Sequence, residues 1–478
     1  MPCHSPQLVI PFTTQDVPNL VRVASVPHSF QIFFGCPGED FEPGGGGASS
    51  DAHQKDWYSR TSVAILARVS HSVSLADYRA ALTAPGARGP VLASVLGRLP
   101  IAMIGLALLL YVQRETGSFA AAGIVSAGTL VGVAFGSVAQ GRVMDRIGPT
   151  RPLLAVTSAF AVLVAAEILA IEAHAPVLVL VPLAVLVGAS EPMIGPAARS
   201  LWTELVPEGP VRNAAYSYEA ISMESFFLLG PGLAGLLVAM PWAGTGTVVG
   251  TLSMIVGAVW FALTPAARRQ RPMAADRTSG SLLGPLASRG MRTVALAALG
   301  FGALLGTIEV AVPAAAERAG HPIMGGILIS VLSVSSVIVG VLYGMNPWPK
   351  PMHLRLPALL LGFALLVAML AVPSTLWGLS LALLVAGSLI TPQSTAHSVS
   401  LEIAAPAGTA TEAFGWVITS VTLGAALGQS VAGQVVEWAN PPASFVVAAI
   451  GGTVLAAVLW FRRATLVPAH TDVSLVPA

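Results

Sequence analysis

Two apolar runs, at about 118–140 and 152–173, are joined by the stretch Gly141-Arg142-Val143-Met144-Asp145-Arg146-Ile147-Gly148-Pro149-Thr150-Arg151-Pro152-Leu153. Each run reaches the ~20 residues that cross the hydrocarbon core of a bilayer as a helix. The glycines of the stretch allow a tight turn, and Asp145 can pair with an arginine or lie near a helix N-terminus. The stretch therefore predicts a short loop between two membrane-spanning helices.

The composition of the whole chain agrees with a location in lipid. Of its 478 residues, 54% are hydrophobic and 10% are charged, whereas an average soluble domain carries about 25% charged residues. So few charges cannot coat a water-soluble protein of this size. The net charge of +1 provides no global attraction for nucleic acid. Both Cys precede the first long apolar run, and neither Lys belongs to a glycine-rich phosphate loop, so we expect no cofactor, no Cys-based metal site and no ATP-driven pump.

From Pro90 onward the apolar runs follow one another at nearly regular intervals. We expect twelve membrane-spanning helices, at about 90–112, 118–140, 152–173, 176–198, 214–240, 243–264, 291–314, 323–345, 355–373, 376–397, 410–434 and 442–462. A basic segment after the sixth span divides them into two sets of nearly equal length. The sequence therefore predicts an all-α integral membrane protein built from two six-helix bundles, which suggests an internal duplication.

The predicted organisation has five segments. They are a disordered N-terminal tail (1–86), an N-terminal six-helix bundle (87–264), a basic cytoplasmic linker (265–290), a C-terminal six-helix bundle (291–463) and a cytoplasmic tail (464–478). Within the N-terminal tail, the stretch from Ser74 to Leu82 predicts a short helix capped by Ser74. The abrupt change in composition after this tail also suggests a translation start further downstream. Most of the 24 Lys and Arg fall in loops on one side, which predicts that both termini are cytoplasmic.

The loop quoted above resembles the cytoplasmic loop signature of the major facilitator superfamily, G-x-L-A-D-R-x-G-R-R-x-x-L. The matching positions are Gly141, Asp145, Arg146, Gly148 and Leu153. Pro149 and Thr150 stand where basic residues are usual, and an ordinary cytoplasmic loop with arginines set by topology is the alternative interpretation. The resemblance implies a monomeric transporter in the plasma membrane that moves a small molecule by rocking of its two halves. It also implies that this loop stabilises the outward-facing state.

A second stretch, Gly230-Pro231-Gly232-Leu233-Ala234-Gly235, resembles the G-P-x-x-G-G core of a signature associated with antiporters. The match is partial, because Ala234 replaces one Gly and Phe226 stands at the position of an outer glycine. A helix kink with a small-residue packing face is the alternative interpretation. The resemblance favours export by antiport over import, and it also gives the pairs Gly132/Gly136 and Gly424/Gly428 a gliding role between the two halves.

Ionisable residues within the predicted spans indicate where a site lies, because each costs ~2.5 kcal/mol or more near the bilayer centre unless it faces a cavity or a partner. These residues are Arg98, Glu167, Glu191, Glu219, Glu224, Glu309 and Glu412. Glu309, deep in the seventh span, is the first choice for a carboxyl that exchanges protons, and Arg98 could hold an anionic substrate or a carboxylate. A structural pair or an interfacial position is the alternative for each of them, above all for Glu219 and Glu412 near span ends.

Aromatic residues and prolines complete the predicted site. Trp416, near Glu412, is expected to line the cavity, whereas Trp202 and Trp377 are expected at the membrane interface. Pro192 and Pro196 should break the fourth span, as Pro392 should break the tenth.

Three functions remain on these grounds. A proton-coupled secondary carrier that exports a small molecule is favoured over an importer and over a non-transporting sensor of the same fold. A membrane-embedded enzyme would need a catalytic cluster at one membrane face, and the sequence offers none. The acid-rich interior favours a cationic or neutral amphipathic substrate.

Overall fold

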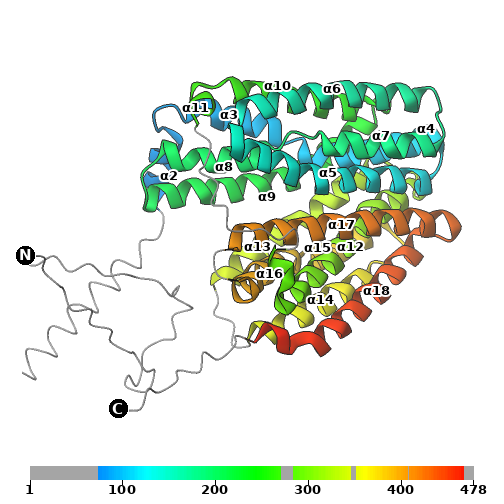
Figure 1. Cartoon of the computed structure of the whole chain (residues 1–478). Coiled ribbons are helices and arrows are strands. Elements are labelled where there is room, and N and C mark those ends of the chain that lie inside the picture. The colour runs from blue at the N-terminus through cyan, green and yellow to red at the C-terminus, as the bar shows by residue number, and fades with distance from the viewer. Residues whose placement is uncertain (1–73, 271–283, 346–350, 407–408, 468–478) are drawn as a thin grey trace, which may run out of the picture. The chain divides into compact units, whose positions relative to one another are not determined.

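The computed structural model describes residues 74–270, 284–345, 351–406 and 409–467 (Figure 1). All regular structure in these residues is helical. The helices of the N-terminal half are α2 (Leu75–Leu82), α3 (Arg88–Arg98), α4 (Ile101–Thr116), α5 (Phe119–Ile147), α6 (Thr150–Glu172), α7 (Val177–Ala189), α8 (Ile194–Leu205), α9 (Pro210–Val238), α10 (Thr245–Leu263) and α11 (Pro265–Arg269). Those of the C-terminal half are η1 (Gly284–Ala287), α12 (Arg289–Arg318), α13 (Met324–Met345), α14 (Met352–Met369), α15 (Leu376–Gly387), α16 (Ile390–Ala404), α17 (Ala410–Trp438), α18 (Pro441–Arg462) and η2 (Arg463–Leu466).

Eleven helical stretches of the described residues are long and apolar enough to cross a membrane. They coincide with eleven of the twelve predicted spans. The span predicted at 323–345 corresponds to α13, whose described apolar part, Met324–Gly340, is shorter than the others. The all-helical membrane fold is therefore confirmed, and the twelfth crossing stays a prediction.

The short helix predicted before the first span is present as α2. The Ser74 side chain accepts from the Asp77 backbone N–H at 3.2 Å, and the Asp77 carboxylate accepts from the Ser74 N–H at 2.9 Å. This capping box satisfies N–H groups that the first turn of a helix leaves without partners. The rest of the predicted tail, residues 1–73, lies outside the described residues, as do 271–283 of the linker and 468–478 of the C-terminal tail.

Three of the spans are interrupted. The fourth consists of α7 and α8 with a break over Ser190–Met193, and the tenth consists of α15 and α16 with a break just before Pro392, so both predicted breaks are present. The break between α3 and α4, at Leu99-Pro100, was not predicted. Proline lacks the N–H that continues the helical hydrogen bonds and clashes with the preceding turn, which accounts for these interruptions.

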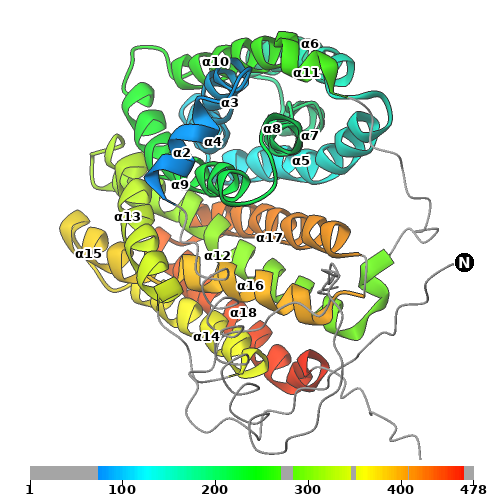
Figure 2. The same ribbon diagram turned by 90° about the vertical axis from the view of Figure 1, so that its left-hand side faces the viewer.

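The two halves touch along two helix pairs, α5 with α17 and α9 with α13 (Figures 1 and 2). A Cβ built on Gly123 of α5 would collide with the backbone of Gln429, and one on Gly433 of α17 would collide with the backbone of Phe119. Gly235 of α9 and Gly326 of α13 approach each other in the same way. We call these two contacts the inter-half seam. Only glycine allows such a close approach of backbones.

The gliding role expected for Gly132/Gly136 and Gly424/Gly428 is wrong in this conformation. Gly132 and Gly136 pack on the backbone of α7, and Gly424 and Gly428 pack on the backbone of α12, so each pair lies within one half. Periodicity identifies such packing faces correctly, but it does not say which neighbour a face meets.

Candidate functional site

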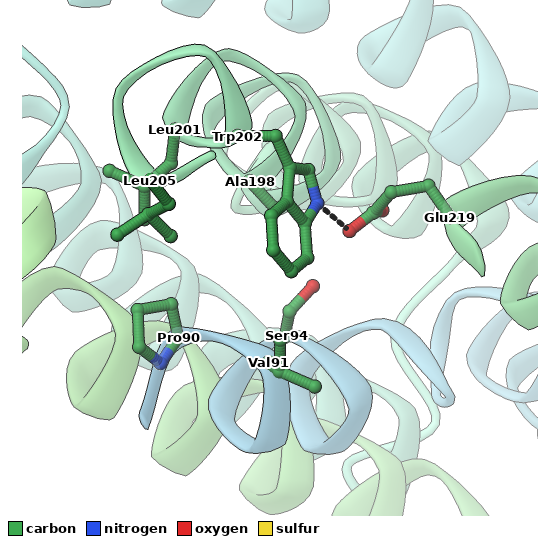
Figure 3. Close-up of a pocket in the computed structure, with 8 residues that line it drawn as sticks. All are labelled: Pro90, Val91, Ser94, Ala198, Leu201, Trp202, Leu205 and Glu219. Atoms are coloured by element: carbon green, nitrogen blue, oxygen red, sulfur yellow. Dashed lines mark hydrogen bonds between the residues drawn. The ribbon is translucent and has the colours of Figure 1, made fainter. Parts of the chain in front are cut away.

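Two buried charged residues of the N-terminal half, Arg98 and Glu219, lie together in one cluster. Arg98 of α3 donates from Nη1 to the Glu219 carboxylate of α9, and both side chains are less than a tenth exposed. The second carboxylate oxygen of Glu219 accepts from the Trp202 indole at 3.0 Å (Figure 3). The pairing removes two isolated charges from the apolar interior and satisfies both oxygens of the carboxylate.

A cavity of about 10 Å³ lies beside this cluster, lined by Ser94, Trp202 and Glu219 among apolar side chains (Figure 3). The Ser94 hydroxyl and the Arg98 Nε are buried without a hydrogen-bond partner. The space is at the lower limit for one water molecule and is too small for a substrate. In this conformation the cluster therefore holds helices α3, α8 and α9 together and does not form a substrate cavity.

The carboxyl predicted to exchange protons, Glu309 on α12, lies behind the inter-half seam. It is half-buried, and its Oε2 accepts from Gln429 Nε2 of α17 at 2.7 Å. The backbone of Gln429 is the part of α17 that Gly123 of the other half contacts. One residue thus contacts an in-span carboxyl with its side chain and the opposite half with its backbone.

Ser333 of α13 donates to the Phe227 carbonyl of α9 at 3.2 Å. Other polar links between the halves lie at one end of the helices, where α4 and α12 finish and α5 begins; we call it the distal end. Gln113 of α4 donates to Glu317 of α12 at 2.8 Å. Glu437 of α17 accepts from the Ser118 hydroxyl at 2.5 Å and from the Ala120 N–H at 3.0 Å, at the N-terminus of α5. A carboxylate is favoured at that position because the helix dipole is positive there. The distal end is therefore closed in this conformation.

A family model described as the Major Facilitator Superfamily matches residues 91–411. The chain belongs to the major facilitator superfamily. Membership of this superfamily supports a function in membrane transport.

Solved structures agree on the fold. A mutant form of a nucleoside transporter, NupG, superposes with a TM-score of 0.63 at 15% identity, covering 78% of this chain and 99% of that chain. A mutant form of a peptide transporter, POT, gives 0.60 at 15% identity, covering 79% and 94%. A bacterial homolog of the human lysosomal transporter Spinster, in an inward-facing and unoccupied conformation, gives 0.60 at 14%, covering 82% and 98%. No curated protein matches the sequence. At these identities the likeness establishes the fold alone.

The other acidic residues that were predicted for the site do not lie together with Glu309 or Arg98. Glu224 is exposed on α9, Glu191 lies in the break between α7 and α8, and Glu167 is buried on α6 with one oxygen unpartnered. Glu412 lies in the first turn of α17, with its carboxyl against Gly284 of η1. Trp416 is half-buried one turn further along α17. The structure thus brings together Arg98 with Glu219 only, and these two form a structural pair.

The loop motif is more helical than predicted. α5 continues through Ile147, since no proline interrupts it before Gly148, and Gly148 ends it with a φ of +82° that other residues rarely adopt. Arg146 is exposed, a Cβ built on Gly141 would meet open space, and the side chain of Asp145 lies outside the described residues. In the second motif, Gly230 packs on α4, whereas Pro231 and Gly235 contact Gly326 of the other half.

Several residues that matter for the site were not found from the sequence. Trp202, expected at the membrane interface, is 2% exposed and binds Glu219, so that expectation is wrong. The sequence analysis did not predict roles for Gln429 and Gln140, because the prediction rested on the charged residues within the spans. An amide in an apolar run is also costly to bury without partners, and that signal could have found both glutamines.

Gln140 of α5 holds the broken fourth span. Its Nε2 donates to the carbonyls of Ala189 at 3.1 Å and Glu191 at 2.8 Å, and its Oε1 accepts from the Met193 N–H at 3.1 Å. These backbone groups have no helical partner at the break, and lipid offers none.

Gln140→Ala should therefore destabilise the N-terminal half, by about 1–3 kcal/mol for each buried backbone group left unpaired. The measurement is thermal unfolding of the purified protein in detergent. Ser137→Ala, on the same helix, is the matched control, because the Ser137 hydroxyl bonds only to Ala134 of its own helix. Equal unfolding temperatures of the two variants would show that Gln140 does not hold the break.

Proposed function

We propose that this superfamily member is a proton-coupled secondary transporter that exports a small molecule by antiport. The two halves would rock around a central site. The observation that carries the proposal is the position of Glu309, whose hydrogen-bond partner Gln429 touches the opposite half at the inter-half seam.

The Glu309–Gln429 pair can satisfy both protonation states of the carboxyl. A charged carboxylate accepts from the amide Nε2, which is the arrangement described above. A protonated Glu309 would instead donate to the amide oxygen, and Gln429 Oε1 is buried without another partner. Turning the amide exchanges the two arrangements, so arrival of a proton would change the contact of a residue that forms part of the seam.

The direction of transport is proposed from the second motif and from the basic loops. With both termini cytoplasmic, the distal end would face the exterior, so the contacts there support an assignment of this conformation to the state closed on the exterior side. Gly235 lies in the inter-half seam, which supports a conformational role for the partial antiporter signature. The loop motif with Asp145 and Arg146 is proposed to stabilise the opposite, outward-facing state.

A cationic or neutral amphipathic substrate fits the charges within the spans. Arg98 is neutralised by Glu219. Among the described residues, Glu224 and Glu309 form no ion pair with a basic side chain, so the remaining in-span charges are acidic. The structural neighbours include a nucleoside transporter and a peptide transporter, which agrees with a small organic substrate.

Flux through the protein tests this function directly. Inverted membrane vesicles with an acidic lumen should accumulate ethidium, a cationic dye, and an uncoupler should abolish the uptake. The substrate class is tested further with a panel of cationic, neutral and anionic compounds. The measurement is the susceptibility of cells to each compound with and without expression of the protein. Movement of a compound that requires the opposite pH gradient would indicate import. If no compound of the panel moves in a gradient-dependent way, a sensor would be favoured.

Locking the distal end should stop transport. In a background without Cys3 and Cys36, the double variant Gln113→Cys with Glu317→Cys places one thiol on each half, at side chains that are hydrogen-bonded at 2.8 Å. A bifunctional methanethiosulfonate about as long as the two replaced side chains should abolish transport by preventing opening, and reduction should restore it.

The control for this experiment joins two residues of one half. Arg114 donates to the Met240 carbonyl at 3.4 Å, so Arg114→Cys with Met240→Cys places both thiols at the distal end of the N-terminal half. This cross-link should leave transport unchanged. Continued transport with the Gln113 and Glu317 positions joined would contradict the rocking mechanism.

A further inference from the structure

An apolar groove of about 400 Å³ lies between α14 and α18 in the C-terminal half. It is lined by residues of Pro357–Leu361 on α14 and of Ala456–Phe461 on α18, with Thr453 as the hydroxyl-bearing residue. Alanines at 358, 456 and 457 leave the space between the larger side chains. Phe461 is 85% exposed and Trp460 44%. Because both helices are candidate spans, the groove faces the region where lipid chains lie.

One end of this groove carries positive charge. The Arg463 guanidinium lies 4.4 Å from the ring centroid of Trp460, which lines the groove. Such a distance is typical of a cation–π contact, which holds the cation at the end of the groove. Arg462 is fixed beside it, with Nε donating to the Thr293 hydroxyl at 3.1 Å. No residue that lines the groove is charged, so apolar and basic surfaces are separated along it.

We propose that this groove binds an anionic phospholipid. One acyl chain lies between α14 and α18, and the headgroup phosphate binds Arg463, with Arg462 next to it. A guanidinium matches the geometry of phosphate oxygens and can donate two parallel hydrogen bonds. Basic pockets between membrane helices bind anionic headgroups on the same principle. The proposal does not depend on the direction or coupling of transport.

Charge complementarity selects this occupant over a zwitterionic lipid. Both kinds of lipid can place a chain in the apolar part, but only an anionic headgroup has net attraction for the arginines. Attraction of a surface arginine for anionic lipid corresponds to about a fivefold preference. Anionic lipids are enriched in the cytoplasmic leaflet, where the orientation predicted from the basic loops places this end of α18.

Native mass spectrometry of the purified chain with equimolar dioleoyl phosphatidylglycerol and dioleoyl phosphatidylcholine tests the proposal. The wild-type protein should retain phosphatidylglycerol about fivefold over phosphatidylcholine. Arg463→Gln should bring the ratio close to one while lipid is still retained, because the groove is intact. Ala457→Trp should reduce retention of both lipids, since Ala457 is exposed in the groove and an indole fills it.

Matched controls lie on α6, another candidate span. Arg151→Gln removes an exposed arginine from the first turn of α6, and Val162→Trp adds an indole at a position that is 68% exposed. Neither should change the ratio or the number of retained lipids, and thermal unfolding checks that all variants are folded. An unchanged ratio in Arg463→Gln, or unchanged retention in Ala457→Trp, would overturn the proposal. A dimer that Ala457→Trp abolishes would assign the groove to a second copy instead.

Discussion

Glu309→Gln should abolish transport driven by a pH gradient and leave exchange of substrate across the membrane intact. A glutamine has nearly the shape of a protonated glutamate but cannot release a proton, so the halves could still alternate without moving protons. The variant keeps an acceptor for Gln429 Nε2, which in the native chain donates to Glu309 at 2.7 Å. Loss of coupling without loss of folding is therefore the expected result.

Proteoliposomes allow the two activities to be measured separately. Uptake is followed once with an imposed pH gradient and once with equal pH and substrate on both sides. Glu204→Gln is the matched control, because Glu204 is an exposed carboxyl at the end of α8. Gln429→Leu keeps the carboxyl and removes its hydrogen bond, so it should weaken gradient-driven transport without abolishing it. Full gradient-driven uptake by Glu309→Gln would exclude Glu309 as the proton carrier.

Arg98→Met should destabilise the protein by about 3–5 kcal/mol, because it leaves the Glu219 carboxylate buried without its cation. Glu219 is 6% exposed, and its remaining described partner is the Trp202 indole at 3.0 Å. The double variant Arg98→Met with Glu219→Gln should recover most of this loss. It removes both charges together, and the amide oxygen still accepts from Trp202.

Thermal unfolding in detergent measures this effect. Glu208→Gln is the control, since Glu208 belongs to an ion pair with Arg212 in which the glutamate side chain is 89% exposed. Exposed pairs contribute about 0–1 kcal/mol, so this variant should unfold close to the wild type. A double variant as unstable as Arg98→Met alone would show that the charge imbalance is not the cause.

We propose that the two kinds of in-span charge have separate roles. Arg98 and Glu219 join three helices of one half and neutralise each other. Glu309 has a neutral partner, which can adapt to either protonation state, and it lies behind a contact between the halves. A fixed ion pair stabilises one arrangement, whereas a carboxyl with an adaptable amide can respond to a proton.

The membrane class, eleven of the spans, the family and the helix capped by Ser74 could all be predicted from the order of the residues. Hydrophobicity, loop charge, proline breaks and capping residues act over a few neighbours in the chain, so they are visible without knowledge of any distant contact. The in-span residues Arg98, Glu219 and Glu309 were found for the same reason, since burying a charge is costly wherever the helix points.

The partner that each of these residues meets is a property of the three-dimensional packing alone. Glu219 lies 121 residues from Arg98, and Gln429 lies 120 residues from Glu309. The glycines expected between the halves pack within them, and Gly123 and Gly433 form the seam instead. Such pairings depend on the rotation and tilt of each helix, which are set by close packing against all of its neighbours at once. No local pattern in the chain contains that information.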